Sequence, residues 1–322
     1  MPKMLTPLVQ DGPIDVDGWK PDEQFAVFPQ GARAKNAMFA PEPPPQVVLK
    51  SGKRYLFKLS RRAYPDQFWA EVVAYRVGCM LDVPVPPAFA GWNSSSGQCG
   101  ALIEWFYDVG TEAFVLAGDF LHQLRPDFDR ARGTTHNMAD NIKLLRALGH
   151  VTSLRGDSRT WWTRALTFDA LIGNTDRHQD NWGLVIDVRE VADLNGRQSW
   201  LAPCFDNGTS LGMELQTERA AKWDVNRLRR YAERGRHHVC WALDDPTRCN
   251  GHLHLLLRAL AEWPEERPRL QELLQKISTE DFARLLSDLT QIDVPVRFTQ
   301  DRFALIVRLL AHRLSSLKES VL

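Results

Sequence analysis

Apolar and polar positions along the chain predict a strand-rich first third and a mainly helical remainder. Between residues 22 and 107, short apolar runs bounded by turn residues are typical of strands. From residue 108 onward, apolar residues recur at the spacing of helices. The turn dipeptide Ser51-Gly52 predicts that the two runs beside it pair as a hairpin. The strands of the first third are predicted at residues 25–28, 36–40, 46–50, 55–59, 86–90 and 101–106.

One helix interrupts these strands. Trp69, Val72, Val77 and Met80 fall on one face at helical spacing, and Asp66 is placed to cap the helix start. The first 21 residues, punctuated by Pro and Gly, are expected to form a loosely held arm. The sequence thus predicts an arm (1–21), a β-rich part (22–107) and a helical part (108–322). In the helical part we expect helices at 137–148, 157–171, 252–262, 280–289 and 300–317, and a hairpin of strands 182–187 and 199–205 turning at Asn195-Gly196.

Composition and charge exclude several classes of protein. The 322 residues are enough for about two domains, and 40 basic residues balance 40 acidic ones. A chain without net charge has no general attraction for nucleic acid or anionic membrane. The five cysteines are scattered without a C-x-x-C pair, as in proteins of reducing compartments, and no apolar run approaches the roughly eighteen residues of a membrane helix. We therefore expect a cytoplasmic protein that binds neither nucleic acid directly nor membrane.

The strongest candidate chemistry lies in the segment LIGNTDRHQDNWG, residues 171–183. Asp176 and Asn181 are five residues apart in a predicted loop between a helix and a strand, where catalytic groups are often displayed. The catalytic loop of protein kinases has the same spacing: its Asp takes the hydroxyl proton and its Asn holds metal. The alternative is a polar turn whose side chains only satisfy backbone groups.

Two further elements suit the same chemistry. Asp206 ends a predicted strand and, beside Asn181, would offer Mg²⁺ hard oxygen ligands; the alternative is an ordinary turn before Asn-Gly. Lys58 lies on a strand between apolar neighbours, and Glu71 lies in the first turns of the helix. A kinase needs a strand lysine that contacts the nucleotide phosphates and a helix glutamate that positions this lysine. The alternative is a surface ion pair that contributes little to stability.

A small basic segment between two predicted strands is a candidate phosphate loop. Its small residues can bring backbone N–H groups close to a phosphate. Neither G-x-G-x-x-G nor a Walker A motif occurs in the chain. The segment consists of Gly31, Ala32, Arg33, Ala34 and Lys35.

The order of these elements resembles the HipA-like serine/threonine kinases, with a more distant likeness to the D-R-H-x-x-N loop of phosphatidylinositol 3/4-kinases. The resemblance implies an α+β, bilobal kinase-like fold with a small β-rich N-lobe containing one helix and a larger, mainly helical C-lobe. The chain has only about 22 residues before its first predicted strand, where HipA toxins usually carry an additional subdomain, and Ala70 stands where the family often has Asn. The matching stretches are GARAK (31–35), YLFKLS (55–60), AEVVAYRVGCMLDVPVP (70–86), LIEWF (102–106), FDALIGNTDRHQDNWGLV (168–185) and WLAPCFDNGTSLG (200–212).

The same resemblance implies ATP- and Mg²⁺-dependent transfer of the γ-phosphate to a Ser/Thr hydroxyl of a protein. Asp176 would orient that hydroxyl or accept its proton, and Asn181 and Asp206 would hold Mg²⁺. A cognate antitoxin-like protein is a further partner that the family implies. Among the remaining residues, Lys58 would contact the phosphates, Glu71 would hold Lys58, residues 31–35 would cover the phosphates, Glu104, Trp105 and Phe106 would form the hinge that meets adenine, and His178 would support the loop.

Three alternatives remain open at this stage. The chain could be a pseudokinase that binds partners, although the lysine, glutamate, asparagine and both aspartates are intact. It could also phosphorylate a small molecule or lipid, since related folds host both activities. A structural zinc site is the third, although His252 and His254 would point about 200° apart on a helix. Its candidate ligands are His237, His238, Cys240, Cys249, His252 and His254.

Overall fold

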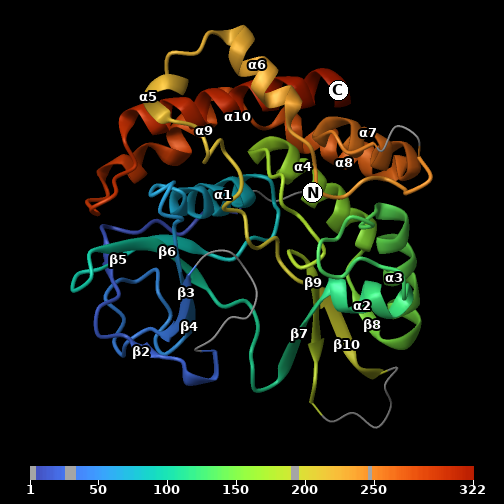
Figure 1. The fold of residues 1–322 in the computed structure, drawn as a ribbon, viewed down its shortest axis with the longest axis horizontal. Coiled ribbons are helices and arrows are strands. Elements are labelled where there is room, and N and C mark those ends of the chain that lie inside the picture. The colour runs from blue at the N-terminus through green and yellow to red at the C-terminus, as the bar shows by residue number, and fades with distance from the viewer. Residues whose placement is uncertain (1–4, 26–33, 190–195, 246–248) are drawn as a thin grey trace.

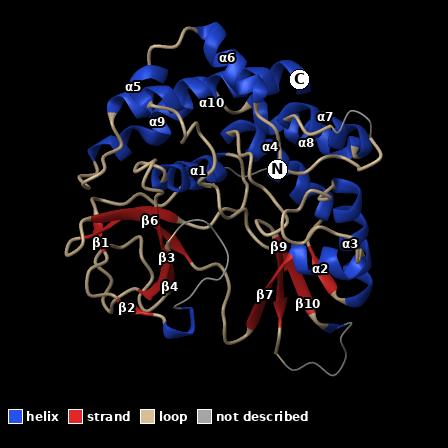
Figure 2. Ribbon diagram, viewed as in Figure 1, coloured by secondary structure: helices blue, strands red, loops and turns tan. Residues whose placement is uncertain are grey.

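Two β-sheets lie side by side, and helices cover them from one end and one flank. In the computed structural model, residues 5–25, 34–189, 196–245 and 249–322 are described. One sheet has six strands and the other has four. Figures 1 and 2 show both sheets in the lower half of the view, with most helices above them.

The six-stranded sheet contains most of the predicted first third. Its strands are antiparallel neighbours except for one parallel pair, β1 with β5. The predicted hairpin of residues 46–50 with 55–59 is wrong, because 46–49 form turns and β4 pairs with β3 instead. Three prolines precede Gln46 and lack the N–H groups that a ladder needs. The strand order is β1 (Ile14–Asp15), β5 (Ala88–Asn93), β6 (Gln98–Glu104), β4 (Arg54–Leu59), β3 (Lys35–Phe39) and β2 (Lys20–Pro21).

The described part of the expected N-terminal arm, residues 5–21, is not loosely held and contributes two short strands to this sheet. Ile14 pairs with Gly91 in the parallel ladder, and the backbone of Ala90 exchanges two hydrogen bonds with the Gln10 side chain, at 2.7 and 3.1 Å. Beyond the arm, Phe25 ends a short 3-10 helix (Glu23–Phe25), and the rest of the predicted strand 25–28 lies outside the described residues.

Helix α1 (Phe68–Met80) is buried on every side rather than on one face. It lies between the six-stranded sheet and helices of the C-terminal part, as Figure 1 shows. Asp66 does not cap it, because its carboxylate lies 3.4 Å from Nε of Arg302 and the cap position belongs to Gln67. Because α1 is buried on every side, its apolar residues are not confined to one face of the helix.

The four-stranded sheet includes the second predicted hairpin. β9 (Gly183–Asp187) and β10 (Gln198–Leu201) pair antiparallel as predicted, while residues 190–195 of their connection lie outside the described part of the chain. The flanking strands β7 (Glu112–Leu116) and β8 (Ser153–Arg155) were not predicted, since each is short and lacks clear alternation.

The helices agree well with the predicted ones. Asn137 and Asp157 cap α3 and α4 with their side chains, and α4 ends at Gly173, whose φ of 67° is the left-handed conformation that favours glycine. The predicted helix 280–289 divides into α9 and a 3-10 turn at Ser287–Gln291. None of the helices in the described ranges combines the length and apolar character needed to cross a membrane. The helices are α2 (Ala117–Leu124), α3 (Met138–Val151), α4 (Ser158–Ile172), α5 (Thr217–Ala220), α6 (Val225–Arg234), α7 (His252–Glu262), α8 (Arg267–Gln275), α9 (Thr279–Leu286) and α10 (Gln300–Val321), with a 3-10 turn at Pro264–Glu266.

Candidate active site

Lys58 lies at the centre of the candidate site. Its Nζ is 2.9 Å from Oε1 of Glu71 and 2.6 Å from Oδ1 of Asp206. Lys58 and Glu71 are 4% and 3% exposed, so this is a buried ion pair and not the exposed pair considered as its alternative. The structure thus brings together a strand residue, a helix residue and a loop residue, the last 148 positions away from Lys58.

Asp206 reaches this lysine because the backbone turns sharply where it follows β10. Its φ is 53°, in the left-handed region that few non-glycine residues adopt, although Asp tolerates it better than most. The next backbone N–H, that of Asn207, donates to Oε2 of Glu71 at 2.9 Å. Glu71 therefore holds both Lys58 and the backbone beside Asp206, which links α1 to the segment that follows β10.

The loop after α4 carries Asp176 and Asn181, and it contacts the segment that follows Asp206. The Asn181 side-chain amide donates to the backbone oxygen of Asp176 at 2.5 Å, which closes the loop. Thr209, from the segment that follows Asp206, donates its hydroxyl to Oδ2 of Asp176 at 3.3 Å. Asp176 is half-buried, and among the described residues no hydrogen bond reaches its Oδ1, which can accept from another donor.

Arg177 is a fully buried residue that sequence reasoning missed. Its guanidinium pairs with both carboxylate oxygens of Asp169, at 2.7 and 3.1 Å. It also donates to the backbone oxygen of Phe205 at 2.6 Å and to Oδ1 of Asn207 at 2.8 Å. Arg177 therefore joins α4, the Asp176 loop and the Asp206 turn into one unit.

Asp169 is held as a carboxylate at the base of this unit. Burial alone would raise the pKa of Asp169, but Arg177 and a hydrogen bond from His237 hold it well below its usual range. His237 Nδ1 accepts from the backbone N–H of Val239, so its Nε2 is the nitrogen that donates to Asp169, at 3.0 Å. No local spacing signals this trio, because His237 lies 68 residues after Asp169.

His178 and the predicted hinge lie beside the central residues. His178 Nδ1 accepts from the backbone N–H of Asp180 at 3.1 Å, a contact within the loop that suits a supporting role. Glu104 is the last residue of β6, and the Trp105 N–H donates to the backbone of β4. The Phe106 ring stacks on Phe205, next to Asp206, at 5.4 Å between centroids. Whether these three residues meet a nucleotide stays a prediction.

The candidate phosphate loop is only partly described. Gly31, Ala32 and Arg33 lie outside the described residues. The Ala34 backbone oxygen accepts from the N–H of Leu59, and Lys35 stands directly opposite Lys58 in the β3–β4 ladder. The end of this segment therefore lies against the strand that carries Lys58.

The predicted zinc ligands do not converge. In the part of the chain that the structure describes, no group of three or more His, Cys, Asp or Glu side chains is arranged to hold a metal ion. His252 donates from Nε2 to the backbone oxygen of Asn174 at 2.6 Å, and His237 is engaged with Asp169. His252 thus contacts the start of the Asp176 loop, and His237 contacts the α4 residue that pairs with Arg177 of that loop.

Comparison with known protein families agrees with this arrangement. Residues 28–287 match the model of the HipA-like C-terminal domain, which is more than half of the chain. The chain belongs to this HipA-like family. The resemblance inferred from the motifs is thereby confirmed.

Solved structures show the fold of this HipA-like chain. It matches the crystal structure of the Helicobacter pylori proinflammatory kinase CtkA with a TM-score of 0.62 and 14% identity, over 96% of both chains. HipA from Shewanella oneidensis MR-1, solved with HipB and operator DNA, aligns with a TM-score of 0.49 and 12% identity, over 92% of this chain and 68% of that one. A search of curated proteins finds no match. The predicted α+β, kinase-like fold is confirmed, while the division at residue 107 stays a prediction.

The buried His252, which contacts the start of the Asp176 loop, predicts how the stability of the HipA-like chain depends on pH. Burial, reinforced by His237, lowers the pKa of His252 to about 3. An unfolded histidine titrates near 6.5, so the unfolded chain binds the proton more readily. The stability contribution is complete above about pH 6.5 and falls as the pH drops towards 3, by about 1.4 kcal/mol per pH unit for this group.

Urea denaturation at pH 7.5 and 5.0 measures this loss. The His252→Gln variant should lose less free energy of unfolding between the two values than the unmodified chain, because Gln keeps a donor but does not titrate. Replacing the exposed His122 by Gln is the matched control and should leave the pH dependence unchanged. An equally steep loss in His252→Gln would contradict the assignment.

Proposed function

We propose that the chain is an ATP- and Mg²⁺-dependent protein kinase that transfers the γ-phosphate to a Ser/Thr hydroxyl. The observation that carries the proposal is the convergence of Lys58, Glu71 and Asp206 within hydrogen-bond distance, beside a loop that holds Asp176 and Asn181 together. Membership of the HipA-like family and the CtkA-like fold support it.

The residues suit phosphoryl transfer because that reaction needs mainly positioning and charge stabilisation. Lys58 supplies a buried positive charge, which acts more strongly there than in water. Asp176 has one oxygen bonded to Thr209, so the other can accept the proton of an incoming hydroxyl. Arg177 keeps the Asp176 loop and the Asp206 turn in register with each other.

The donor set also fits Mg²⁺. Asp206 provides carboxylate oxygens, and the Asn181 amide nitrogen is engaged with Asp176, which leaves Oδ1 without a partner among the described residues. Carboxylate and amide oxygens are the ligands that Mg²⁺ prefers. Asp206 and Asn181 would hold the ion, which when bound would neutralise charge on the nucleotide phosphates. A cognate antitoxin-like partner, by contrast, stays a prediction from the resemblance alone.

Incubation with γ-labelled ATP and cell lysate, followed by phosphoamino-acid analysis, tests the proposal. We expect labelled phosphoserine or phosphothreonine, and a melting temperature that rises with Mg·ATP. A ligand at a hundredfold excess over its dissociation constant stabilises the folded state by about 2.7 kcal/mol. Label confined to lipids or small metabolites would favour the alternative kinase class, and binding without transfer would favour a pseudokinase. If millimolar Mg·ATP did not raise the melting temperature, the protein kinase, the kinase of a lipid or small molecule and the nucleotide-binding pseudokinase would all be contradicted.

A further inference from the structure

A block of exposed basic residues lies on α6 and on the residues that flank it. Between Arg219 and Arg236 the chain has seven basic and two acidic residues; since the whole chain has 40 of each, 33 basic and 38 acidic residues remain elsewhere. This short segment therefore has a net charge of +5, and the rest of the chain has a net charge of −5. We call the seven exposed residues the basic patch: Arg219, Lys222, Arg227, Arg229, Arg230, Arg234 and Arg236.

The basic patch has a firm support. Leu228 is the buried residue of α6, and it packs with Ala220, Leu305 and Leu309 in a small apolar cluster between α6 and α10. Arg308 of α10 donates to the backbone oxygens of Ala221, at 2.9 Å, and Trp223. The inner face of α6 thus holds the helix in place, while its charged faces point to solvent.

Few carboxylates neutralise the basic patch. Arg229 lies 3.8 Å from Glu233 in an exposed pair, and such pairs are weak. Asp224 instead caps α6 by accepting from the Arg227 N–H at 2.7 Å. Arg230 and Arg234 have no ion pair within the described ranges. Arg227, Arg230 and Arg234 follow the three- and four-residue spacing that places them on one face of the helix.

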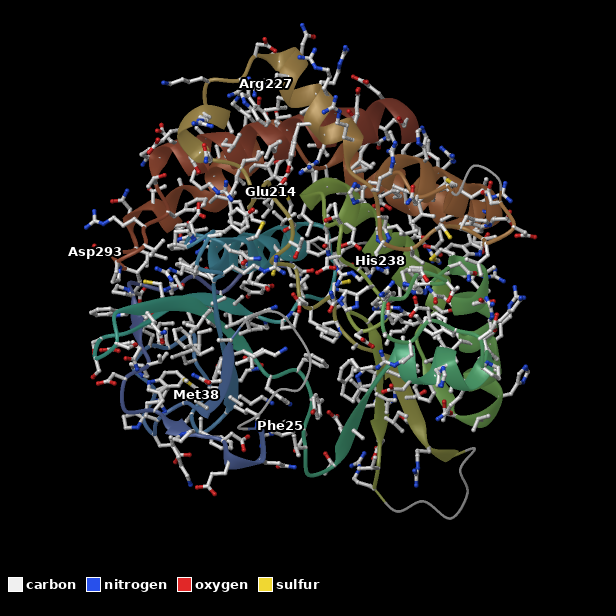
Figure 3. The ribbon with its side chains drawn as sticks, in the orientation of Figure 1. Phe25, Met38, Glu214, Arg227, His238 and Asp293 are labelled. Atoms are coloured by element: carbon white, nitrogen blue, oxygen red, sulfur yellow. The ribbon has the colours of Figure 1, made fainter. Side chains whose placement is uncertain are left out.

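The basic patch lies at the far end of the segment that begins at Asp206. This segment contacts Asp176 through Thr209, and its Gly212 backbone oxygen accepts from Arg302 at 3.0 Å. Figure 3 shows Glu214 between the centre of the molecule and Arg227 at the upper edge. A polypeptide bound to the basic patch can therefore follow an ordered segment towards Asp176.

We propose that the basic patch docks an acidic segment of the protein that supplies the Ser/Thr hydroxyl; this rests on the proposed function. A short acidic peptide matches α6, which spans about 15 Å. A nucleic acid carries a charge about every 1.7 Å and extends further. Outside this segment the chain has more acidic than basic residues, 38 against 33, so a long polyanion gains less from the rest of the chain. Charge complementarity over one short helix therefore favours a protein segment.

Two fluorescent peptides test the docking surface in the full chain without nucleotide. Both carry one serine, and they differ only in that a run of glutamates in the first is a run of glutamines in the second. The basic variant combines Arg227→Glu, Arg230→Glu and Arg234→Glu. The matched control combines Arg146→Glu, Arg284→Glu and Arg297→Glu, three exposed residues elsewhere with the same total change of charge.

By fluorescence anisotropy, the glutamate peptide should bind the unmodified chain at least about tenfold more tightly than the glutamine peptide. Added salt should reduce that difference. The basic variant should lose the preference and the control should keep it. With Mg·ATP, the basic variant should raise KM for the glutamate peptide about tenfold and leave kcat within about twofold.

Equal binding of the two peptides, or equal loss in the basic variant and the control, would overturn the docking surface. Tighter binding of a single-stranded oligonucleotide of equal charge would also overturn it, in favour of nucleic acid. Selective peptide binding without phosphate transfer would support the docking surface and contradict the proposed function. Phosphate transfer with no preference for the glutamate peptide would support the proposed function and contradict the docking surface.

Discussion

Asp176→Asn is expected to lower phosphate transfer by about 10²- to 10⁴-fold, the range typical of a lost general base, while Mg·ATP affinity stays within a few-fold. An amide can still accept from Thr209 but cannot take the proton of the acceptor hydroxyl. Asp206→Asn should lose both transfer and nucleotide affinity, because this carboxylate pairs with Lys58 and would hold the metal. Single-turnover transfer and calorimetric titration with Mg·ATP separate the two effects.

Asp180→Asn is the matched control for Asp176→Asn. It is the same substitution in the same loop, but the Asp180 carboxylate pairs with Arg130 at 2.7 Å. We expect this control to retain most of the transfer rate. If Asp176→Asn and Asp206→Asn weakened Mg·ATP binding equally, the roles assigned to the two aspartates would be wrong.

Asp169→Asn should produce the largest loss of stability of any single substitution considered for this chain. It leaves the Arg177 charge fully buried without a carboxylate, and breaking a buried pair in this way costs about 3–5 kcal/mol. Natural domains are stable by only about 5–15 kcal/mol, so the variant should unfold at much lower urea. The free energy of unfolding, measured by urea denaturation, quantifies the loss.

Two comparisons keep this expectation testable. Asp187→Asn removes the carboxylate of the solvent-screened Arg189 pair and should change the free energy of unfolding very little. Replacing both buried partners, with Asp169→Leu and Arg177→Met, should recover part of the lost stability, since no unpaired charge then remains. A loss in Asp169→Asn no larger than that in Asp187→Asn would show that the buried pair does not stabilise the fold.

The sequence predicts those parts of the site whose signals are local. Asp176 and Asn181 share one loop, so their spacing alone indicates the pairing that the structure shows. Lys58 and Glu71 lie 13 residues apart on a strand and the helix that follows it, and their order along the chain indicates the contact. The predicted helices that begin at Asn137 and Asp157 are confirmed because their caps are also local.

Features that depend on distant segments could not be predicted in this way. Arg177 and His237 both contact Asp169. His237 is far from the other two along the chain, and only the folded structure brings it close to them. Its position before an apolar run suggests that Asp66 caps a helix. In the structure its carboxylate instead lies beside Arg302, which is far along the chain. Residues 46–50 suit a strand by composition, yet the place beside β4 belongs to β3. For Asp66 and for residues 46–50, the tertiary structure overrides what the local sequence suggests.

The parallel pairing of β1 with β5 covers one side of an inner strand of the six-stranded sheet. Without Ile14 and Asp15, the sheet would end at β5, a six-residue strand whose first four residues are buried. An uncovered apolar strand of this kind is a template for pairing with another chain. Ile14 and Asp15 contribute no candidate catalytic group, but by pairing with β5 they occupy the backbone positions to which a strand of another chain could otherwise add.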